Sequence, residues 1–264
     1  MRNFWNSPSP EPKIIAETPL YLVVYKPPGI HTAPLAGEDE GTLLSWVAAS
    51  YPDVLAPRGR LGREGGLLHR LDYETRGLVL IARTQAALEA LLCRQEQDRI
   101  VKEYTALSAG GGEAPPGFPP FPAAGFFSFS AEAGTEQLRV IESGFRPYGR
   151  GRKMVRPVLP GPGQTLYQTG ILFWTADNRD PGPPGEGGPW GFLPGPGRIF
   201  RLRISRGYRH QIRSHLAWAG WPIVNDPLYG GAAVSAVPGL ALSAEVISFT
   251  DPETGRRVRY RLDY

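Results

Sequence analysis

Three short segments of this chain combine charged and aromatic side chains in patterns that could do chemistry. The first, His69-Arg70-Leu71-Asp72-Tyr73-Glu74-Thr75-Arg76-Gly77, comes just before the apolar run Leu78–Ala82. Functional residues are often found on loops that a rigid strand holds in place. Asp72 could be a nucleophile, a base or only the former of a tight turn, since Asp is common in turns. The residue types alone leave these three roles open.

The other two segments offer an aromatic ring and a group of arginines. Lys102-Glu103-Tyr104 lies on an expected strand, where a Tyr is more often part of the core than of a reaction. The stretch RLRISRGYRHQIR, Arg201 to Arg213, passes from an expected strand to an expected helix at Gly207. Arginines at such a turn can bind phosphates together with the N-terminus of the helix. A solvated basic edge of the fold is the alternative.

The histidines are not spaced like metal ligands. His210 and His215 are five residues apart, so on one helix they would point about 140° apart. His31 and His69 have no Cys or His near them in the sequence, and no spacing resembles a zinc site. The chain also lacks a Gly-x-Gly-x-x-Gly that opens a helix and a Gly-Lys-Ser/Thr loop. We therefore expect neither a metal nor a cofactor.

Composition and charge narrow the class of protein. The 264 residues carry 29 Lys and Arg against 25 Asp and Glu, a net charge of +4, and 41% are hydrophobic. Such a chain can bury a core without disulfides, and its basic balance favours an anionic partner, most commonly a nucleic acid. The N-terminus is polar, and no run reaches the roughly 18 apolar residues of a membrane span. With Cys93 as the only cysteine, we expect a cytoplasmic protein without membrane contact; the oligomeric state cannot be predicted.

The apolar patterns predict more strands than helices. Helices are expected after Thr42, a possible N-cap, after Thr84, and from His210 to Ala219, where Ile212, Leu216 and Ala219 share a face. The expected strands are Leu20–Tyr25, Leu78–Ala82, Val101–Leu107, Gln137–Glu142, Thr165–Trp174, Ile199–Ser205, Leu240–Phe249 and Arg256–Leu262. Because no regular βαβ alternation is present, these elements predict an α+β fold with a largely antiparallel sheet.

Glycine and proline are concentrated in the middle of the chain. They take 10 of the 17 positions from Ala109 to Gly125 and 13 of the 22 from Asp177 to Arg198. Such stretches do not continue a helix or a sheet ladder. We expect insertions over about 109–125 and 156–198, as surface loops or, for one of them, as a functional lid.

Four segments, in order, are similar to the pseudouridine synthases of the RluA/RsuA type. LLHRLDYETRGLVLIAR (Leu67–Arg83) resembles the family's His-Arg-Leu-Asp motif with its Thr-x-Gly and apolar strand. VYKPPGIHTAP (Val24–Pro34) resembles its Lys-Pro-x-Gly segment, and KEYTAL (Lys102–Leu107) its Lys-x-Tyr strand. Gly207–Gly230 resembles its closing His-Gln-Ile-Arg-x-His-Leu and Pro-Ile-x-x-Asp-x-x-Tyr-Gly stretch. The resemblance leaves out the Pro/Gly-rich middle.

The resemblance implies an α+β pseudouridine synthase-like fold, with flanking helices and a central cleft. Residues 1–19 would be an N-terminal extension and residues 20–264 the catalytic domain, with no S4-like RNA-binding domain before it. Asp72 would attack the target uridine, and Arg213 would pair with Asp72 and keep it ionised. Tyr104 would stack on the flipped base and help to remove its C5 proton.

The resemblance also implies a set of RNA-binding residues. Ile212 would pack on the other side of the base, and Arg70 would fill the space that the base leaves in the RNA stack. The further candidates for substrate binding are His69, His210, Gln211, Arg206 and Arg76.

Three positions depart from the family's pattern. Arg76 stands where the family usually has Ser, and Tyr208 and Arg209 stand where it usually has Arg and Thr. Arg76 would either contact a phosphate or lie in solvent. The other two departures leave the details of the RNA contacts near Gly207 open.

The function that follows is an RNA pseudouridine synthase that isomerises uridines of rRNA or tRNA. This isomerisation needs no redox cofactor or energy donor, which agrees with the lack of nucleotide-binding motifs. A non-catalytic RNA-binding protein with the same fold is the alternative. A hydrolase that uses Asp72 and Glu74 is a third reading, which no third group in the segment supports.

Overall fold

The computed structural model describes residues 11–35, 40–59, 62, 64–108, 113–122, 128–130, 138–173 and 198–262, and the chain forms two compact units. The Asp72 unit contains the described residues up to Glu103 and those from Ser243 onward. The Arg213 unit contains the described residues from Tyr104 to Leu242. The chain therefore changes unit within two strands, β4 (Val101–Ser108) and β10 (Leu242–Thr250).

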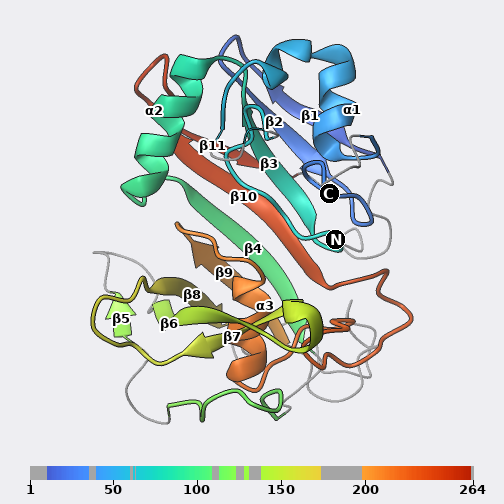
Figure 1. Ribbon diagram of the computed structural model, residues 1–264, viewed down its shortest axis with the longest axis vertical. Helices are drawn as coiled ribbons and strands as arrows, with labels where there is room; N and C mark the ends of the chain where they lie inside the picture. Colours follow the sequence, from blue (N-terminus) through green and yellow to red (C-terminus); the bar gives the residue numbers. More distant parts are fainter. Residues whose placement is uncertain are drawn as a thin grey trace. The chain divides into compact units, whose positions relative to one another are not determined.

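The Asp72 unit consists of a mixed sheet with helices (Figure 1). Besides β10, its elements are β1 (Lys13–Glu17), β2 (Tyr21–Lys26), α1 (Leu43–Ser50), η1 (Pro52–Leu55), β3 (Arg76–Ala82), α2 (Gln85–Glu96) and β11 (Arg257–Arg261). The strands follow the order β1-β2-β3-β10-β11. β3 and β10 run parallel, and the other neighbours run antiparallel.

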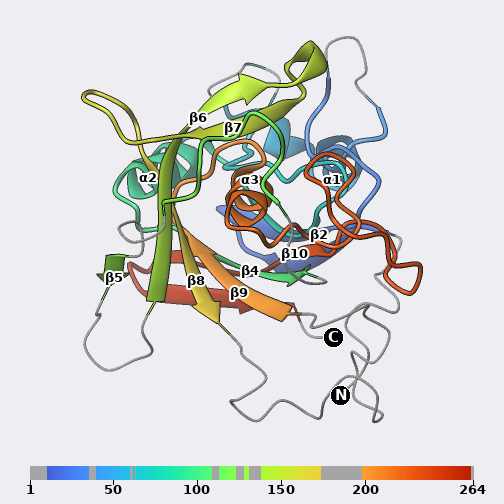
Figure 2. The ribbon, with the colours of Figure 1, turned by 90° about the horizontal axis from the view of Figure 1, so that it is seen from below.

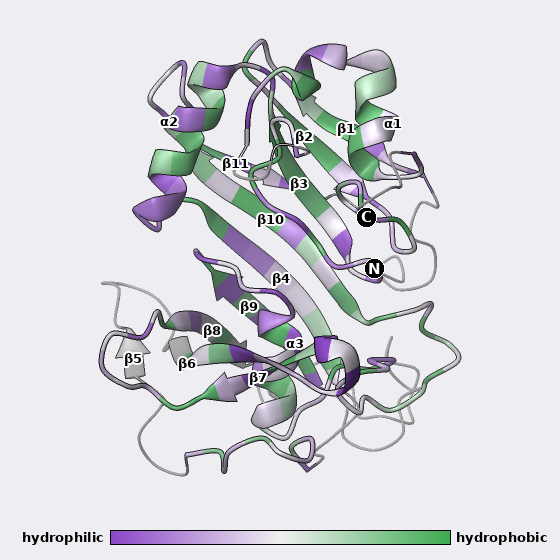
Figure 3. Cartoon of the chain, in the orientation of Figure 1, coloured by the Kyte–Doolittle hydropathy of each residue, from purple (hydrophilic) through white to green (hydrophobic). Residues whose placement is uncertain are grey.

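The core of this unit lies along β2 and β3, whose residues are all buried. A strand that is covered on both faces is apolar throughout, which is why these two strands are mostly hydrophobic in Figure 3. One face packs against Leu88 and Leu91 of α2. The cap predicted at Thr42 is confirmed, because Thr42 Oγ1 accepts a hydrogen bond from Ser45 N at 3.1 Å. Thr84 Oγ1 caps α2 in the same way and accepts a hydrogen bond from Ala87 N, also at 3.1 Å.

The Arg213 unit has a sheet and one α-helix in its described part. Besides β4, its elements are β5 (Ser128–Ser130), β6 (Leu138–Tyr148), η2 (Arg150–Arg152), β7 (Met154–Val158), β8 (Tyr167–Phe173), β9 (Arg198–Ile204) and α3 (Gln211–Trp218). The strands follow the order β4-β9-β8-β6-β5, and β7 pairs with β6 outside that path.

β6 pairs with β5 and with two further strands along different parts of its length. Its first half, Arg139–Ser143, pairs with β8, and its second half, Gly144–Tyr148, pairs with β7. Figure 2 shows β6 leaving the side of β8 and continuing into the hairpin with β7. This hairpin lies against α3, because α3 contacts both β7 and β8.

The helix α3 is buried on every side. All eight of its residues are buried, so the single apolar face predicted from Ile212, Leu216 and Ala219 is only part of its packing. His210 is the N-cap residue with φ +54°, outside the helix that was predicted to begin with it. The helix ends at Trp218 with Ala219 as its C-cap, and the next residue, Gly220, has a φ of +81°, which favours a residue without a Cβ.

The α+β fold with a largely antiparallel sheet is confirmed, and each predicted strand and helix has a counterpart. The sequence patterns missed β1. This strand lies in the stretch 1–19, which was expected to be an N-terminal extension, and it pairs with β2. They also missed β7. The end of β7 and the whole of β8 lie in the stretch 156–198, which was expected to be an insertion. Residues 174–197 and parts of 109–125 lie outside the described residues. Within the described ranges, no helix is long and apolar enough to span a bilayer.

Candidate functional site

The backbone on both sides of Asp72 is held by a second loop of the same unit, residues 26–32. Thr32 Oγ1 donates a hydrogen bond to Leu71 O (2.9 Å) and accepts one from Leu71 N (3.1 Å). Gly29 N donates to Tyr73 O (2.9 Å), and Thr75 N closes the turn on Asp72 O (3.0 Å). The residues before and after Asp72 are therefore both fixed, while Asp72 itself is only half-buried.

Lys26 joins the two loops from below the surface. Its fully buried ammonium donates to Pro27 O and Ile30 O (2.8 Å each) and to Tyr73 O (3.2 Å). Burial lowers the pKa of Lys26 from 10.5 to about 7, and the negative charges of Asp72 and Glu74 partly oppose this shift. The buried amino group of Lys26 thus ties together the backbone of both loops through three carbonyls, and the charges of Asp72 and Glu74 favour its protonated form.

The basic residues around Asp72 differ in their accessibility. The side chain of Arg70 is 59% exposed and forms an ion pair with Glu64 (3.3 Å), so it can reach a ligand. His69 Nε2 accepts a hydrogen bond from Leu80 N (3.3 Å). Burial, together with the charge of Lys102, holds the pKa of His69 well below 6.5, so the ring is neutral. Arg76 is only 1% exposed. The alternative that placed it in solvent is wrong, because β3 begins at this residue, next to β10.

Tyr104 lies on a strand whose alternate residues are buried. Lys102, Tyr104 and Ala106 share one face of β4, and Tyr104 is 7% exposed. Burial lowers the pKa of Lys102 from 10.5 to about 8. The structure gives Tyr104 the buried position of a core residue, and its contact with a base stays a prediction.

In the Arg213 unit, Arg213 is held by a carboxylate that the sequence analysis did not single out. Arg213 Nε and Nη2 donate to Asp226 Oδ2 (2.8 Å) and Oδ1 (2.9 Å), and both side chains are at most 1% exposed. Asp226 Oδ1 also accepts from the backbone of Leu228 (3.0 Å) and Tyr229 (3.2 Å). The two-point contact fixes the plane of the guanidinium. Asp72 and Arg213 belong to different units, so their predicted pairing stays a prediction.

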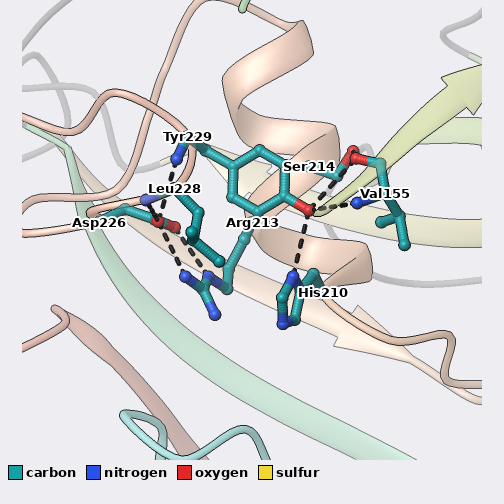
Figure 4. A network of polar contacts seen from close by, with 7 residues as sticks. All are labelled: Val155, His210, Arg213, Ser214, Asp226, Leu228 and Tyr229. Carbon is teal, nitrogen blue, oxygen red and sulfur yellow. Dashed lines mark hydrogen bonds and ion pairs between the residues drawn. The ribbon is translucent and has the colours of Figure 1, made fainter. Parts of the chain in front are cut away.

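Tyr229 extends this polar network to the β6–β7 hairpin (Figure 4). Its hydroxyl accepts a hydrogen bond from Val155 N (2.9 Å) and lies 3.2 Å from both Val155 O and His210 Nδ1. Ser214 Oγ donates to the same carbonyl (3.2 Å). The hairpin, the N-terminal end of α3 and the Asp226 loop are thus joined around Arg213.

The turn before α3 shows what the departures from the family's pattern do here. Tyr208 stacks on Phe145 with ring centroids 5.1 Å apart and planes 8° apart. Arg209 Nη2 donates to Arg152 O (2.7 Å) and Met154 O (3.1 Å). Gln211 Oε1 accepts from Tyr208 N (2.9 Å). Both departures therefore attach the turn to the β6–β7 hairpin.

The remaining predicted site residues of this unit differ in how exposed they are. Ile212 is 4% and Gln211 2% exposed, whereas Arg206 is exposed at the turn between β9 and α3. The sequence analysis assigned no role to Lys26, Thr32, Asp226 or Tyr229. All four lie in segments that carried the resemblance, which was the signal that could have found them. In the described part of the chain, no three His, Cys, Asp or Glu side chains gather as metal ligands would.

The chain is similar to proteins of one known family. A family profile described as RNA pseudouridylate synthase matches residues 20–218. An RNA pseudouridine synthase of Chloroflexus aurantiacus is 33% identical over 205 residues, which cover 78% of this chain and 50% of that protein. Ribosomal large subunit pseudouridine synthase D of Pseudomonas aeruginosa is 24% identical, and the match covers 97% of this chain and 69% of that protein.

Two human structures share the fold. RNA pseudouridylate synthase domain containing 1 aligns with a TM-score of 0.60 and 18% identity, covering 96% of this chain and 84% of that one. RNA pseudouridylate synthase domain containing 4 aligns with a TM-score of 0.55 and 15% identity, covering 95% and 87%. The chain spans only about half the length of several curated relatives, 50% and 52% for those of Chloroflexus aurantiacus and Yersinia pestis. Because the profile matches most of its residues, the chain belongs to the RNA pseudouridylate synthase family.

Proposed function

We propose that this protein is an RNA pseudouridine synthase in which Asp72 is the catalytic carboxylate. The observation that carries the proposal is the double fixation of the Asp72 loop, at Leu71 by Thr32 and at Tyr73 by Lys26 and Gly29. A catalytic group gains from being held in one position before the substrate arrives. A carboxylate that served only to form a turn would not need two supports from another loop.

In the proposed reaction, Asp72 attacks C1′ of the flipped uridine, the N1–C1′ bond breaks, and the base is released as an anion. The base rotates, and C5 bonds to C1′ as the bond between Asp72 and C1′ breaks, which regenerates the carboxylate. The C5 proton then leaves and N1 takes up a proton, so atoms and charge balance. Arg213, oriented by Asp226, pairs with Asp72. Tyr104 and Ile212 enclose the base, and Arg70 takes its place in the RNA stack.

The substrate class is RNA, and we propose large-subunit rRNA as the first RNA to test, with tRNA as the second. Relatives that are named ribosomal large subunit pseudouridine synthase D motivate this order. A cytoplasmic location, where both RNAs are found, belongs to the same proposal. A high density of arginines near the turn before α3 offers phosphate contacts, with Arg206 and Arg209 both exposed.

The test is the release of tritium from C5-labelled uridine in unmodified rRNA and tRNA transcripts. The wild type should release tritium, and Asp72→Asn should lower the rate by about 10³-fold or more, because an amide is not a comparable nucleophile. RNA binding by filter retention should stay within about threefold, since no phosphate contact is lost. Full activity of Asp72→Asn would overturn the assignment of the carboxylate. Binding without release by the wild type would favour the non-catalytic alternative.

A further inference from the structure

An exposed aromatic ring follows the candidate catalytic carboxylate directly. Tyr73 is 45% exposed, although Tyr21, Tyr25, Tyr104 and Tyr229 are all buried. Its backbone is fixed, because its carbonyl accepts hydrogen bonds from Lys26 Nζ (3.2 Å) and Gly29 N (2.9 Å). A ring that is nearly half exposed is thus presented on a fixed backbone.

The ring of Tyr73 also has an aromatic neighbour on the supporting loop. The centroid of the His31 ring lies 4.8 Å away, with an angle of 49° between the planes. His31 is itself held in place, because its carbonyl accepts a hydrogen bond from Leu43 N at the start of α1 (2.8 Å). The two rings therefore brace each other from two fixed backbones, which lowers the entropy that a bound ligand would have to remove.

The charges around Tyr73 indicate which part of a nucleotide its ring would contact. Asp72 precedes it and Glu74 follows it, and both carboxylates act on Lys26. Two neighbouring carboxylates repel a phosphate group, whereas they do not oppose the uncharged face of a base. Base–aromatic stacking tolerates any base and contributes about 1–3 kcal/mol per base.

We propose that Tyr73, braced by His31, is a stacking platform for the unpaired nucleobase next to the target uridine. The inference rests on the proposed function, because extrusion of the target exposes the faces of its neighbours in the RNA stack. Tyr73 is then a binding residue that restricts substrates to uridines with an unpaired neighbour. It takes no part in the bond-making steps.

The first test separates binding from turnover with three variants. Tyr73→Leu removes the aromatic face and should raise KM about 5- to 150-fold, the equivalent of the stacking energy of one base. Its kcat should stay within about twofold of the wild type, and Tyr73→Phe should keep a wild-type KM. Trp46→Leu is the matched control, because Trp46 is another exposed aromatic of the same unit (42%). It should change neither constant.

The second test does not depend on turnover. A substrate stem-loop carries 2-aminopurine on the 5′ or the 3′ side of the target uridine, and its fluorescence is quenched when it stacks on an aromatic ring. One of the two positions should be quenched by the wild type and by Tyr73→Phe, and not by Tyr73→Leu. Equal quenching and equal KM for Tyr73→Leu would overturn the platform. A wild type that quenches but forms no product would refute the proposed function and leave the platform standing.

Discussion

At the scale of single residues, the site depends more on side chains that support Asp72 than on side chains that surround it. Thr32 is 3% exposed, and its hydroxyl both donates to and accepts from the backbone of Leu71. Lys26 performs the same task on the other side of Asp72, at Tyr73. Neither residue has to touch the substrate, so we regard both as positioning residues.

We expect Thr32→Val to lower kcat by about 10- to 100-fold while KM changes less than threefold. Valine has nearly the same shape, but it leaves the buried N–H and C=O of Leu71 without their partner, and a small displacement of a catalytic group costs about this much. Single-turnover rates with saturating RNA measure the effect. Thr32→Ser, which keeps the hydroxyl, should restore most of the rate, and an equal loss in both variants would contradict the role of the hydrogen bonds.

At the scale of elements, the approach of two parallel strands sets where the Asp72 loop ends. Gly77 of β3 has φ +135° and pairs with Ala244 of β10. A Cβ at this position would collide with the backbone oxygen of Ala244 and lie 2.6 Å from its nitrogen. The close contact fixes β3 in the sheet only five residues after Asp72.

Gly77→Ala should therefore destabilise the Asp72 unit by about 2 kcal/mol or more, through overpacking and an unfavourable φ. Urea unfolding followed by circular dichroism measures the change. Gly161→Ala is a suitable control, because the nearest atom to its Cβ would be Gln164 Oε1 at 3.8 Å. Similar stability of the two variants would show that β3 and β10 can move apart at this position without a loss in the free energy of unfolding.

The helix α3 carries a second prediction at this scale, which concerns acid stability. His215 is fully buried, with Nδ1 2.8 Å from Thr169 Oγ1 and Nε2 2.9 Å from Ser143 Oγ. Burial lowers its pKa from 6.5 to about 3. Between these values the unfolded chain binds a proton that the folded chain does not, so the free energy of unfolding falls as the pH falls.

The contribution of neutral His215 to the free energy of unfolding is fully present above pH 6.5 and is lost progressively toward pH 3. His215→Gln removes this titration. It should reduce the slope of the free energy of unfolding against pH by up to about 1.4 kcal/mol per pH unit. Urea titrations of both proteins from pH 7 to pH 4 provide the comparison. Asp251, whose pKa is also lowered, is present in both and cancels. Parallel curves for the two proteins would rule out His215 as the source.

At the scale of the whole molecule, the sequence predicted the elements better than their connections. Apolar runs and their spacing are local signals, so β2 and β3 begin and end close to where the patterns placed them, and α1 and α2 follow Thr42 and Thr84 as expected. β1 and β7 owe their structure to pairing with β2 and β6, which no local pattern records. For the same reason Arg213 and Asp72 could be named from motifs, whereas the Asp226 clamp and the Thr32 support depend on contacts across loops.

The charge of the molecule is distributed unevenly, and this asymmetry has a measurable consequence. Residues 143–173 contain five Lys or Arg and residues 198–225 contain six, and neither stretch contains an Asp or Glu. Arg150 and Arg152 are exposed at the tip of the β6–β7 hairpin, which Arg209 attaches to the turn before α3. A surface of this kind favours binding to phosphates of RNA through the release of counterions.

The affinity for substrate RNA should therefore fall linearly with salt concentration on a double-logarithmic plot, by about 0.7–0.9 per phosphate contact. The double variant Arg150→Gln/Arg152→Gln should lower the slope by one to two contacts and weaken the binding of every RNA sequence about equally. Filter binding of the Asp72→Asn protein from about 50 to 200 mM salt separates affinity from turnover. Arg256→Gln, an exposed arginine of the other unit, is the control and should leave the slope unchanged. If the double variant keeps the full slope, the phosphates contact other arginines, and the hairpin serves only to hold α3 in place.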